Sequence, residues 1–149
     1  MKTLTVLLLA AACAAATGSA ATAGTEHSKP IVVTFQKHLV DADNLVFQGT
    51  AGGRAKGALE SRMVPGSLTI AGAVWHFAFD WIIDARSPHK SFVARTDGTF
   101  DLTTGRVVME GTVTDGWHQG AAVHEEGQLL DPDTFTFAGE LQIAGDGED

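Results

Sequence analysis

From residue 31 to residue 143 the chain alternates apolar and polar residues with a period of two, and turn-forming residues interrupt the pattern about every eight to 12 positions. A period of two places successive side chains on opposite faces of a β-strand. Short strands separated by regular turn signals are typical of an antiparallel sandwich or barrel. The pattern therefore predicts an all-β domain without a helix.

The clearest strand is predicted at residues 74–84, where large apolar side chains occupy the odd positions. They are Trp75, Phe77, Phe79, Trp81 and Ile83. The even positions include His76, Asp80 and Asp84, which we expect on the outer face. The same alternation predicts strands at residues 31–35, 44–50, 54–64, 91–96, 99–103, 107–114, 121–130 and 134–143. Between two of them, Asp97-Gly98 is predicted as a tight hairpin turn.

Strands that follow one another through short turns favour an up-and-down antiparallel barrel of about eight strands. Closure removes the free strand edges that this lysine-poor sheet would otherwise expose. A barrel of about eight strands is wide enough to be filled by its side chains or to hold one small ligand. A two-sheet β-sandwich is the alternative. Gly-Thr pairs recur at Gly49, Gly98 and Gly111 and indicate bends or bulges.

The N-terminal segment has the composition of an export signal. Lys2 is followed by an apolar run at residues 4–16, which is too short to span a bilayer as a helix, and then by small residues up to Ala23. The predicted organisation is a signal peptide at residues 1–23, a flexible segment at 24–30, one barrel domain at 31–144 and an acidic tail at 145–149. We expect a secreted or periplasmic protein. A lipid anchor at Cys13, cleavage after Ala20 and a buried Ala-rich helix are the alternatives.

Charge and cysteine content exclude several classes of function. Cleavage after Ala23 leaves nine Lys and Arg against 18 Asp and Glu, a formal charge of −9, and no cysteine. Because nucleic acids and anionic membranes bind clustered cations, neither is an expected partner. Thiol catalysis, disulfides and cysteine-based metal sites are excluded for the cleaved chain. No hydrolase, kinase or dehydrogenase motif occurs, and we expect no cofactor and no membrane span.

The aromatic face of residues 74–84 supplies the candidate ligand contacts. Trp75, Phe77, Phe79 and Trp81 would line a pocket for an aromatic or other hydrophobic molecule, and Trp117 would add to it. The alternative is that these side chains are ordinary core. Both interpretations place the face of residues 74–84 inside the barrel.

Glu125 and His118 are the candidate catalytic residues. Glu125 shares a strand face with apolar residues, so the alternation places a carboxyl group inside the barrel if that face is the inner one. Burial raises the pKa of an unpaired carboxyl group, which suits a general acid or base. Either Glu125 or His118 would carry a proton during the reaction. A structural ion pair of Glu125 with Arg62 or Arg95 is the alternative, because ion pairs also shift pKa values.

Histidines near acidic residues suggest a metal site only by composition. His118 and His124 flank a possible tight connection and have carboxylates nearby. There is no His-x-His and no His-Glu-x-x-His, the spacings that bind zinc or iron. No metal site is predicted.

One part of the chain resembles a known family. The resemblance is carried by residues 98–106 (GTFDLTTGR) and continues through Gly111-Thr112-Val113 to Gly120-Ala121. These segments resemble small exported bacterial proteins of the allene-oxide-cyclase-like barrel group, to which the dirigent proteins are related. The likeness extends over roughly residues 46–143 as a pattern of glycine-marked hairpins.

The resemblance implies an eight-stranded antiparallel barrel with a central cavity, often trimeric, in which some members guide cyclisation or coupling of hydrophobic substrates. It assigns no catalytic residue, because no local motif matches and the cleaved chain has neither Tyr nor Cys. The expected function is therefore binding of a hydrophobic or aromatic small molecule by an exported barrel, with dirigent-like or cyclase-like activity and homo-oligomers as expectations. A non-catalytic envelope or interaction protein is the alternative.

Overall fold

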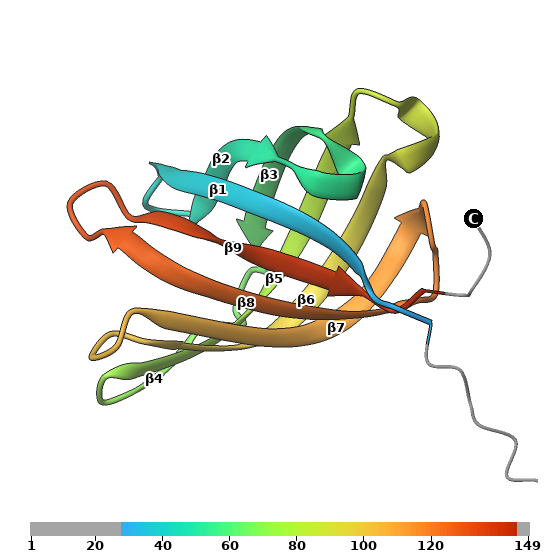
Figure 1. Cartoon of the computed structure of the whole chain (residues 1–149). Coiled ribbons are helices and arrows are strands. Elements are labelled where there is room, and N and C mark those ends of the chain that lie inside the picture. The colour runs from blue at the N-terminus through green and yellow to red at the C-terminus, as the bar shows by residue number, and fades with distance from the viewer. Residues whose placement is uncertain (1–27, 146–149) are drawn as a thin grey trace, which may run out of the picture.

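A computed structural model describes residues 28–145 as a barrel of β-strands (Figure 1). The predicted signal peptide at residues 1–23 and most of the predicted tail lie outside the described residues. The strands are β1 (Ile31–Asp41), β2 (Val46–Ala51), β3 (Gly57–Met63), β4 (Thr69–Ala71), β5 (Val74–Ala85), β6 (Phe92–Asp101), β7 (Arg106–Gly116), β8 (Ala122–Asp131) and β9 (Thr136–Ile143). Within these residues the only helical segments are the short 3-10 turns η1 (Gly53–Ala55) and η2 (Pro88–Lys90).

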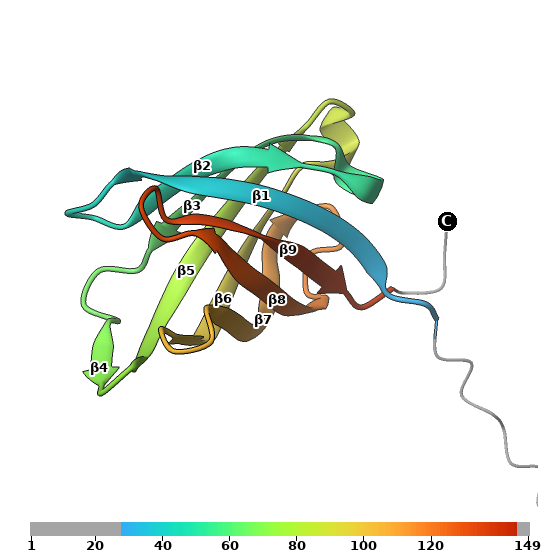
Figure 2. The same cartoon turned by 60° about the vertical axis from the view of Figure 1, so that its left-hand side comes forward.

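Eight strands close into an antiparallel barrel (Figure 2). Neighbours follow the order β3-β2-β1-β9-β8-β7-β6-β5, and β5 pairs again with β3, from Gly57 opposite Ala85 to Met63 opposite Phe79. The short strand β4 lies outside this ring and pairs with the start of β5. The prediction of an antiparallel barrel of about eight strands is confirmed. The sandwich alternative is wrong, because the pairing of β3 with β5 joins the two edges of the sheet.

The predicted hairpin at Asp97-Gly98 is wrong, because both residues lie within the continuous strand β6. Gly98 has another role there. A Cβ atom at Gly98 would come within 2.2 Å of a carbonyl oxygen of the neighbouring strand, and at Gly49 and Gly111 within 1.9 and 1.8 Å. Any larger residue at these positions would collide with backbone. The Gly-Thr pairs thus mark places where adjacent strands of the barrel approach each other closely.

The first strand is longer than the predicted segment of residues 31–35. β1 continues to Asp41, and its inner face runs through Val33, Phe35 and Lys37, all three buried. A lysine at an inner position breaks the apolar pattern, since lysine is almost never fully buried without a partner. The inner face of β1 therefore carries a cation to the centre of the barrel.

Aromatic side chains fill most of the interior. Ring centroids lie 4.9 Å apart for Phe35 and Trp81, 5.0 Å for Phe77 and Phe79, and 5.2 Å for Phe100 and Phe137. All three pairs meet edge to face, the arrangement that aromatic quadrupoles favour. On the outer face of β5, His76 and Asp84 are exposed and Asp80 is half-buried, as the alternation predicts.

Candidate functional site

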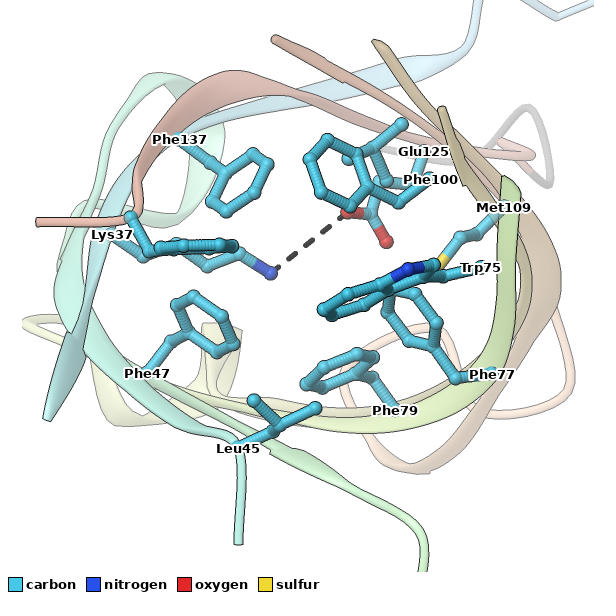
Figure 3. Close-up of a pocket in the computed structure, with 12 residues that line it drawn as sticks. Lys37, Leu45, Phe47, Trp75, Phe77, Phe79, Phe100, Met109, Glu125 and Phe137 are labelled. Carbon is cyan, nitrogen blue, oxygen red and sulfur yellow. Dashed lines mark ion pairs between the residues drawn. The ribbon is translucent and has the colours of Figure 1, made fainter. Parts of the chain in front are cut away.

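An apolar pocket lies at one end of the barrel, around a cavity of about 30 Å³ (Figure 3). Lys37 and Glu125 are the charged residues of its wall. The other lining residues are Leu45, Phe47, Trp75, Phe77, Phe79, Phe100, Val107, Met109, Phe135 and Phe137. A cavity of this volume accommodates one water-sized group. The pocket is thus a narrow aromatic space with one pair of charged groups.

The Lys37 and Glu125 side chains face each other across the barrel interior (Figure 3). Lys37 Nζ lies 3.9 Å from Glu125 Oε1, and the two side chains are 7% and 1% exposed. Nζ donates a hydrogen bond to Ser61 Oγ at 3.2 Å and lies 3.9 Å from the centroid of the Trp81 ring. A cation over an indole face is attracted by the ring quadrupole. The ammonium group is therefore held by an anion, a hydroxyl group and an aromatic face.

Burial moves both pKa values toward the neutral forms of the pair. Burial lowers the pKa of Lys37 from 10.5 to about 8, and the charge of Glu125 opposes part of this change. Burial raises the pKa of the Glu125 carboxyl group, while Lys37 and the hydroxyl group of Thr96 oppose the change. Transfer of one proton from Lys37 to Glu125 turns the charged pair into a neutral amine and a carboxylic acid with no change in net charge. The pair can therefore act as a proton donor and acceptor.

Several polar groups of the site are incompletely hydrogen-bonded. At 3.9 Å the Lys37 to Glu125 contact is too long for a hydrogen bond, and Thr96 donates to Glu125 Oε2 at 3.3 Å. The indole Nε1–H of Trp81 is buried without a hydrogen-bond partner among residues 28–145. It is nevertheless close enough to Glu125 to help lower the pKa of that carboxyl group. Buried polar groups normally have hydrogen-bond partners, so the unpaired N–H of Trp81 and the ammonium group of Lys37 are donors that a polar ligand atom can satisfy.

Three hairpins of similar design surround the pocket end of the barrel. In each, an Asp carboxylate accepts the backbone N–H two residues ahead, and the fourth residue after the Asp has a positive φ. The acceptors are Asp41, Asp101 and Asp131, and the positive-φ residues are Leu45 at 48°, Gly105 at 72° and Phe135 at 49°. Glycine adopts this conformation freely, whereas a bulky side chain is strained in it. Two strained residues therefore hold apolar side chains at the pocket mouth.

The structure brings together only some of the predicted site residues. Trp75, Phe77, Phe79 and Glu125 line the pocket, which the strand alternation of the sequence anticipates. Trp81 is fully buried beneath Lys37 Nζ.

Trp117 and His118 lie away from these residues. They occupy the turn between β7 and β8, at the opposite end of the barrel from the pocket. There Trp117 packs against Phe92 and His118, with centroids 6.4 and 4.6 Å apart, and receives Lys90 Nζ at 5.6 Å. The structure does not bring His118 to Glu125.

The predicted partners of Glu125 are wrong, because Lys37 fills that place. Arg95 donates two hydrogen bonds to Asp80 on the outer face, at 2.7 and 2.8 Å, and Arg62 pairs with Glu60. Both arginines are one residue out of phase with the inward-facing positions of their strands, so their side chains point outward. Sequence reasoning missed Lys37, although its even spacing from Val33 and Phe35 places it on the inner face.

His124 lies on the outer surface of β8, between two carboxylates. Its ring nitrogens contact Glu126 and Glu110, and the hydrogen bonds with these two carboxylates raise the pKa of the imidazole. No group of three or more His, Cys, Asp or Glu side chains within residues 28–145 is placed to hold a metal ion. Over the same residues, no helix has the length and apolar character needed to cross a membrane.

Comparison with protein-family models and with curated proteins gave no match to this chain.

Proposed function

We propose that the protein binds a small hydrophobic or aromatic molecule in the pocket, with its apolar body against the aromatic wall and a polar end at Lys37 and Glu125. The single observation that carries the proposal is a buried ion pair in an otherwise apolar, mostly aromatic pocket. Replacing such a pair by packed apolar side chains is often neutral or stabilising, so stability alone does not explain it. A role in recognising a polar group does.

The mouth of the pocket supports entry of a ligand. Leu45, Trp75 and Phe135 are half-buried and lie where the strands end, so they can turn outward into solvent. Because the cavity is about 30 Å³, a molecule larger than one water-sized group requires this movement. The proposed ligand is therefore small, with one polar end and an aromatic or aliphatic body.

We also propose that the pair of Lys37 and Glu125 catalyses a reaction and that the protein acts outside the cytoplasm. An amine and a carboxyl group that exchange a proton can promote cyclisation or coupling of the bound molecule, with Lys37 and Glu125 as the acting residues. The signal peptide predicted at residues 1–23 would make the protein act after export.

A second candidate function is that of a non-catalytic interaction protein. Exposed apolar side chains surround the pocket end of the barrel: Val40, Ile70, Leu102 and Leu130 are 43% to 60% exposed. Such residues at one end suit contact with a partner or with another copy of the chain. Absence of small-molecule binding in the test below would favour this candidate.

The test compares benzyl alcohol with ethylbenzene, which has the same shape but no hydroxyl group. We expect saturable binding of both and a preference for benzyl alcohol of about tenfold, the effect of one hydrogen bond to a charged group. The measurement is the shift of indole N–H signals in proton–nitrogen NMR spectra. Trp75 and Trp81 should respond, and Trp117, at the other end of the barrel, serves as the internal control.

The variant Lys37→Met/Glu125→Leu tests the role of the charged pair in this preference. It should bind both compounds with similar affinity, because the apolar wall remains and the polar groups are gone. The outer-face variant Asp80→Asn should keep the preference. Shifts of all three indole signals together, or no saturable shift, would contradict the proposal.

The variant Phe135→Gly should bind benzyl alcohol about fivefold more tightly, which corresponds to about 1 kcal/mol. Glycine accepts the positive φ of this position and removes a side chain that must move when a ligand enters. Leu45→Gly should act in the same direction. The measurement is the same NMR titration, and an unchanged or weaker affinity in both variants would show that these side chains do not restrict entry.

A further inference from the structure

Lys37 differs from the other described lysines by its position. Lys29 and Lys56 are exposed and Lys90 is half-buried, whereas Lys37 is 6% exposed and its side chain lines the pocket. Its immediate neighbours are the carboxyl group of Glu125, the hydroxyl group of Ser61 and the indole of Trp81. A desolvated amine beside a proton carrier in an apolar pocket is the arrangement that makes lysine a nucleophile toward carbonyl compounds.

We propose that Lys37 forms a Schiff base with a small apolar aldehyde or ketone in the pocket, and that Glu125 carries the protons of this reaction. The inference rests on the proposed function and names its substrate class. It needs no oxidant, reductant or metal ion, because imine formation releases only water.

The reaction begins with the neutral form of the pair, a Lys37 amine and a Glu125 carboxylic acid. The Nζ lone pair forms a bond to the carbonyl carbon, the C=O π electrons move to oxygen, and this oxygen takes the proton of Glu125. The carboxylate then takes one of the nitrogen-bound protons and delivers it to the hydroxyl group. The C–O bond breaks, water leaves, and the nitrogen lone pair forms the C=N bond. The remaining proton on nitrogen stays as an iminium cation opposite the Glu125 carboxylate or passes back to it.

The surroundings of Lys37 favour this chemistry in three ways. The 3.9 Å between Nζ and Oε1 is longer than a direct proton transfer allows, so the proton is carried by a carbonyl oxygen or one water that contacts both groups from the side. The aromatic rings around Nζ, with centroids 5.1 to 5.4 Å away for Phe35, Phe47 and Phe79, exclude bulk water that would hydrolyse an imine. At pH 7 a lysine with a pKa of about 8 has roughly two orders of magnitude more neutral amine than one at 10.5.

The experiment treats the full chain at pH 7 with benzaldehyde and sodium cyanoborohydride, which reduces an imine to a stable benzyl amine. Peptide mass spectrometry then compares the rate of benzyl addition at Lys37 with the rates at Lys29, Lys56 and Lys90. We expect Lys37 to react at least about tenfold faster, because its neutral fraction is roughly two orders of magnitude larger and its burial offsets only part of that advantage. Ethylbenzene should slow labelling at Lys37 and leave the surface lysines unaffected.

Two variants separate the roles of the paired groups. Glu125→Gln keeps the shape of the side chain and should slow labelling at Lys37 by about 100-fold, the lower range for loss of an acid–base group. Lys37→Arg keeps a cation opposite Glu125 and should abolish labelling inside the pocket. Ethylbenzene binds through the apolar wall alone, so its titration against the Trp75 signal checks that the pocket of both variants is still folded and open.

The outcomes distinguish this inference from the proposed function. If benzyl alcohol shifts the Trp75 and Trp81 signals but Lys37 reacts no faster than the surface lysines, the Schiff base is excluded and ligand binding stands. If neither binding nor labelling occurs, both proposals fail. Fast labelling that persists unchanged in Glu125→Gln would overturn the role of Glu125 while keeping the Lys37 nucleophile.

Discussion

The variant Lys37→Met is expected to lower the free energy of unfolding by about 3 to 5 kcal/mol at pH 7, the range measured when one partner of a buried ion pair is removed. The physical reason is that Glu125, 1% exposed, loses the cation that faces it. Holding its carboxyl group protonated at pH 7, against an ordinary pKa of 4.5, itself costs about 3 kcal/mol. Urea unfolding followed by tryptophan fluorescence measures the change.

The double variant Lys37→Met/Glu125→Leu should recover the stability of the wild type or exceed it by about 1 to 4 kcal/mol, because no buried charge remains. The control is Arg95→Ala, which removes the exposed ion pair with Asp80 and should change stability by less than about 1 kcal/mol. The deficit of Lys37→Met should shrink as the pH approaches 4.5, where Glu125 is protonated in the unfolded chain as well. A single variant as stable as the double variant would show that Glu125 needs no partner.

Stability should rise between pH 8 and pH 10.5 by up to about 3 kcal/mol through Lys37 alone. In this window the unfolded chain, with its Lys37 pKa near 10.5, binds more protons than the folded chain, with its pKa at about 8. The stabilising contribution is therefore fully present above pH 10.5 and is lost as the pH falls through 8. The chain has no Tyr, so no phenol titrates in the same window.

Glu125 gives the opposite slope at lower pH. Its pKa is raised in the folded protein, so the folded chain binds more protons above pH 4.5 and the contribution to stability falls as the pH rises through the folded pKa. The two groups together predict a minimum of stability between the two folded pKa values. The free energy of unfolding is measured with urea from pH 4 to pH 11 for the wild type and for Lys37→Met/Glu125→Leu. The difference between the two proteins at each pH is the contribution of Lys37 and Glu125. A flat difference would mean that neither group shifts on folding.

The sequence is sufficient to predict the barrel because side chains alternate between the two faces of a strand over most of its length, with register shifts only at bulges such as the one between Val93 and Ala94. The alternation at residues 74–84 predicts the inner face of β5 correctly, from Trp75 to Ile83. It failed at Asp97-Gly98, because a dipeptide that favours turns can also lie in a strand where a neighbouring backbone leaves no room for a Cβ atom. Whether Asp97-Gly98 forms a turn or continues a strand depends on contacts between segments that are distant in the sequence, and the local sequence pattern carries no information on these contacts.

Of the two charged residues of the candidate site, only the inward position of Glu125 is predicted from the sequence. The strand phase of Glu125 places it inside the barrel, as found, but its partner depends on which strands face each other across the interior. Arg62 and Arg95 were plausible by charge, and their strand phase excludes them once the inner face is known. His118 lies in the turn between β7 and β8, at the end of the barrel opposite the pocket, and sequence alone does not show at which end of the barrel a turn lies.

The buried ion pair of Lys37 and Glu125 affects how the protein responds to salt. Surface charges are screened over about 8 Å at physiological ionic strength, so the many outer carboxylates change their mutual repulsion as salt varies. Lys37 and Glu125 sum to zero charge both as an ion pair and as a neutral pair, and salt screens such a buried pair much less than it screens surface charges. The electrostatics of the barrel interior should therefore change much less between dilute and concentrated salt than those of its exterior.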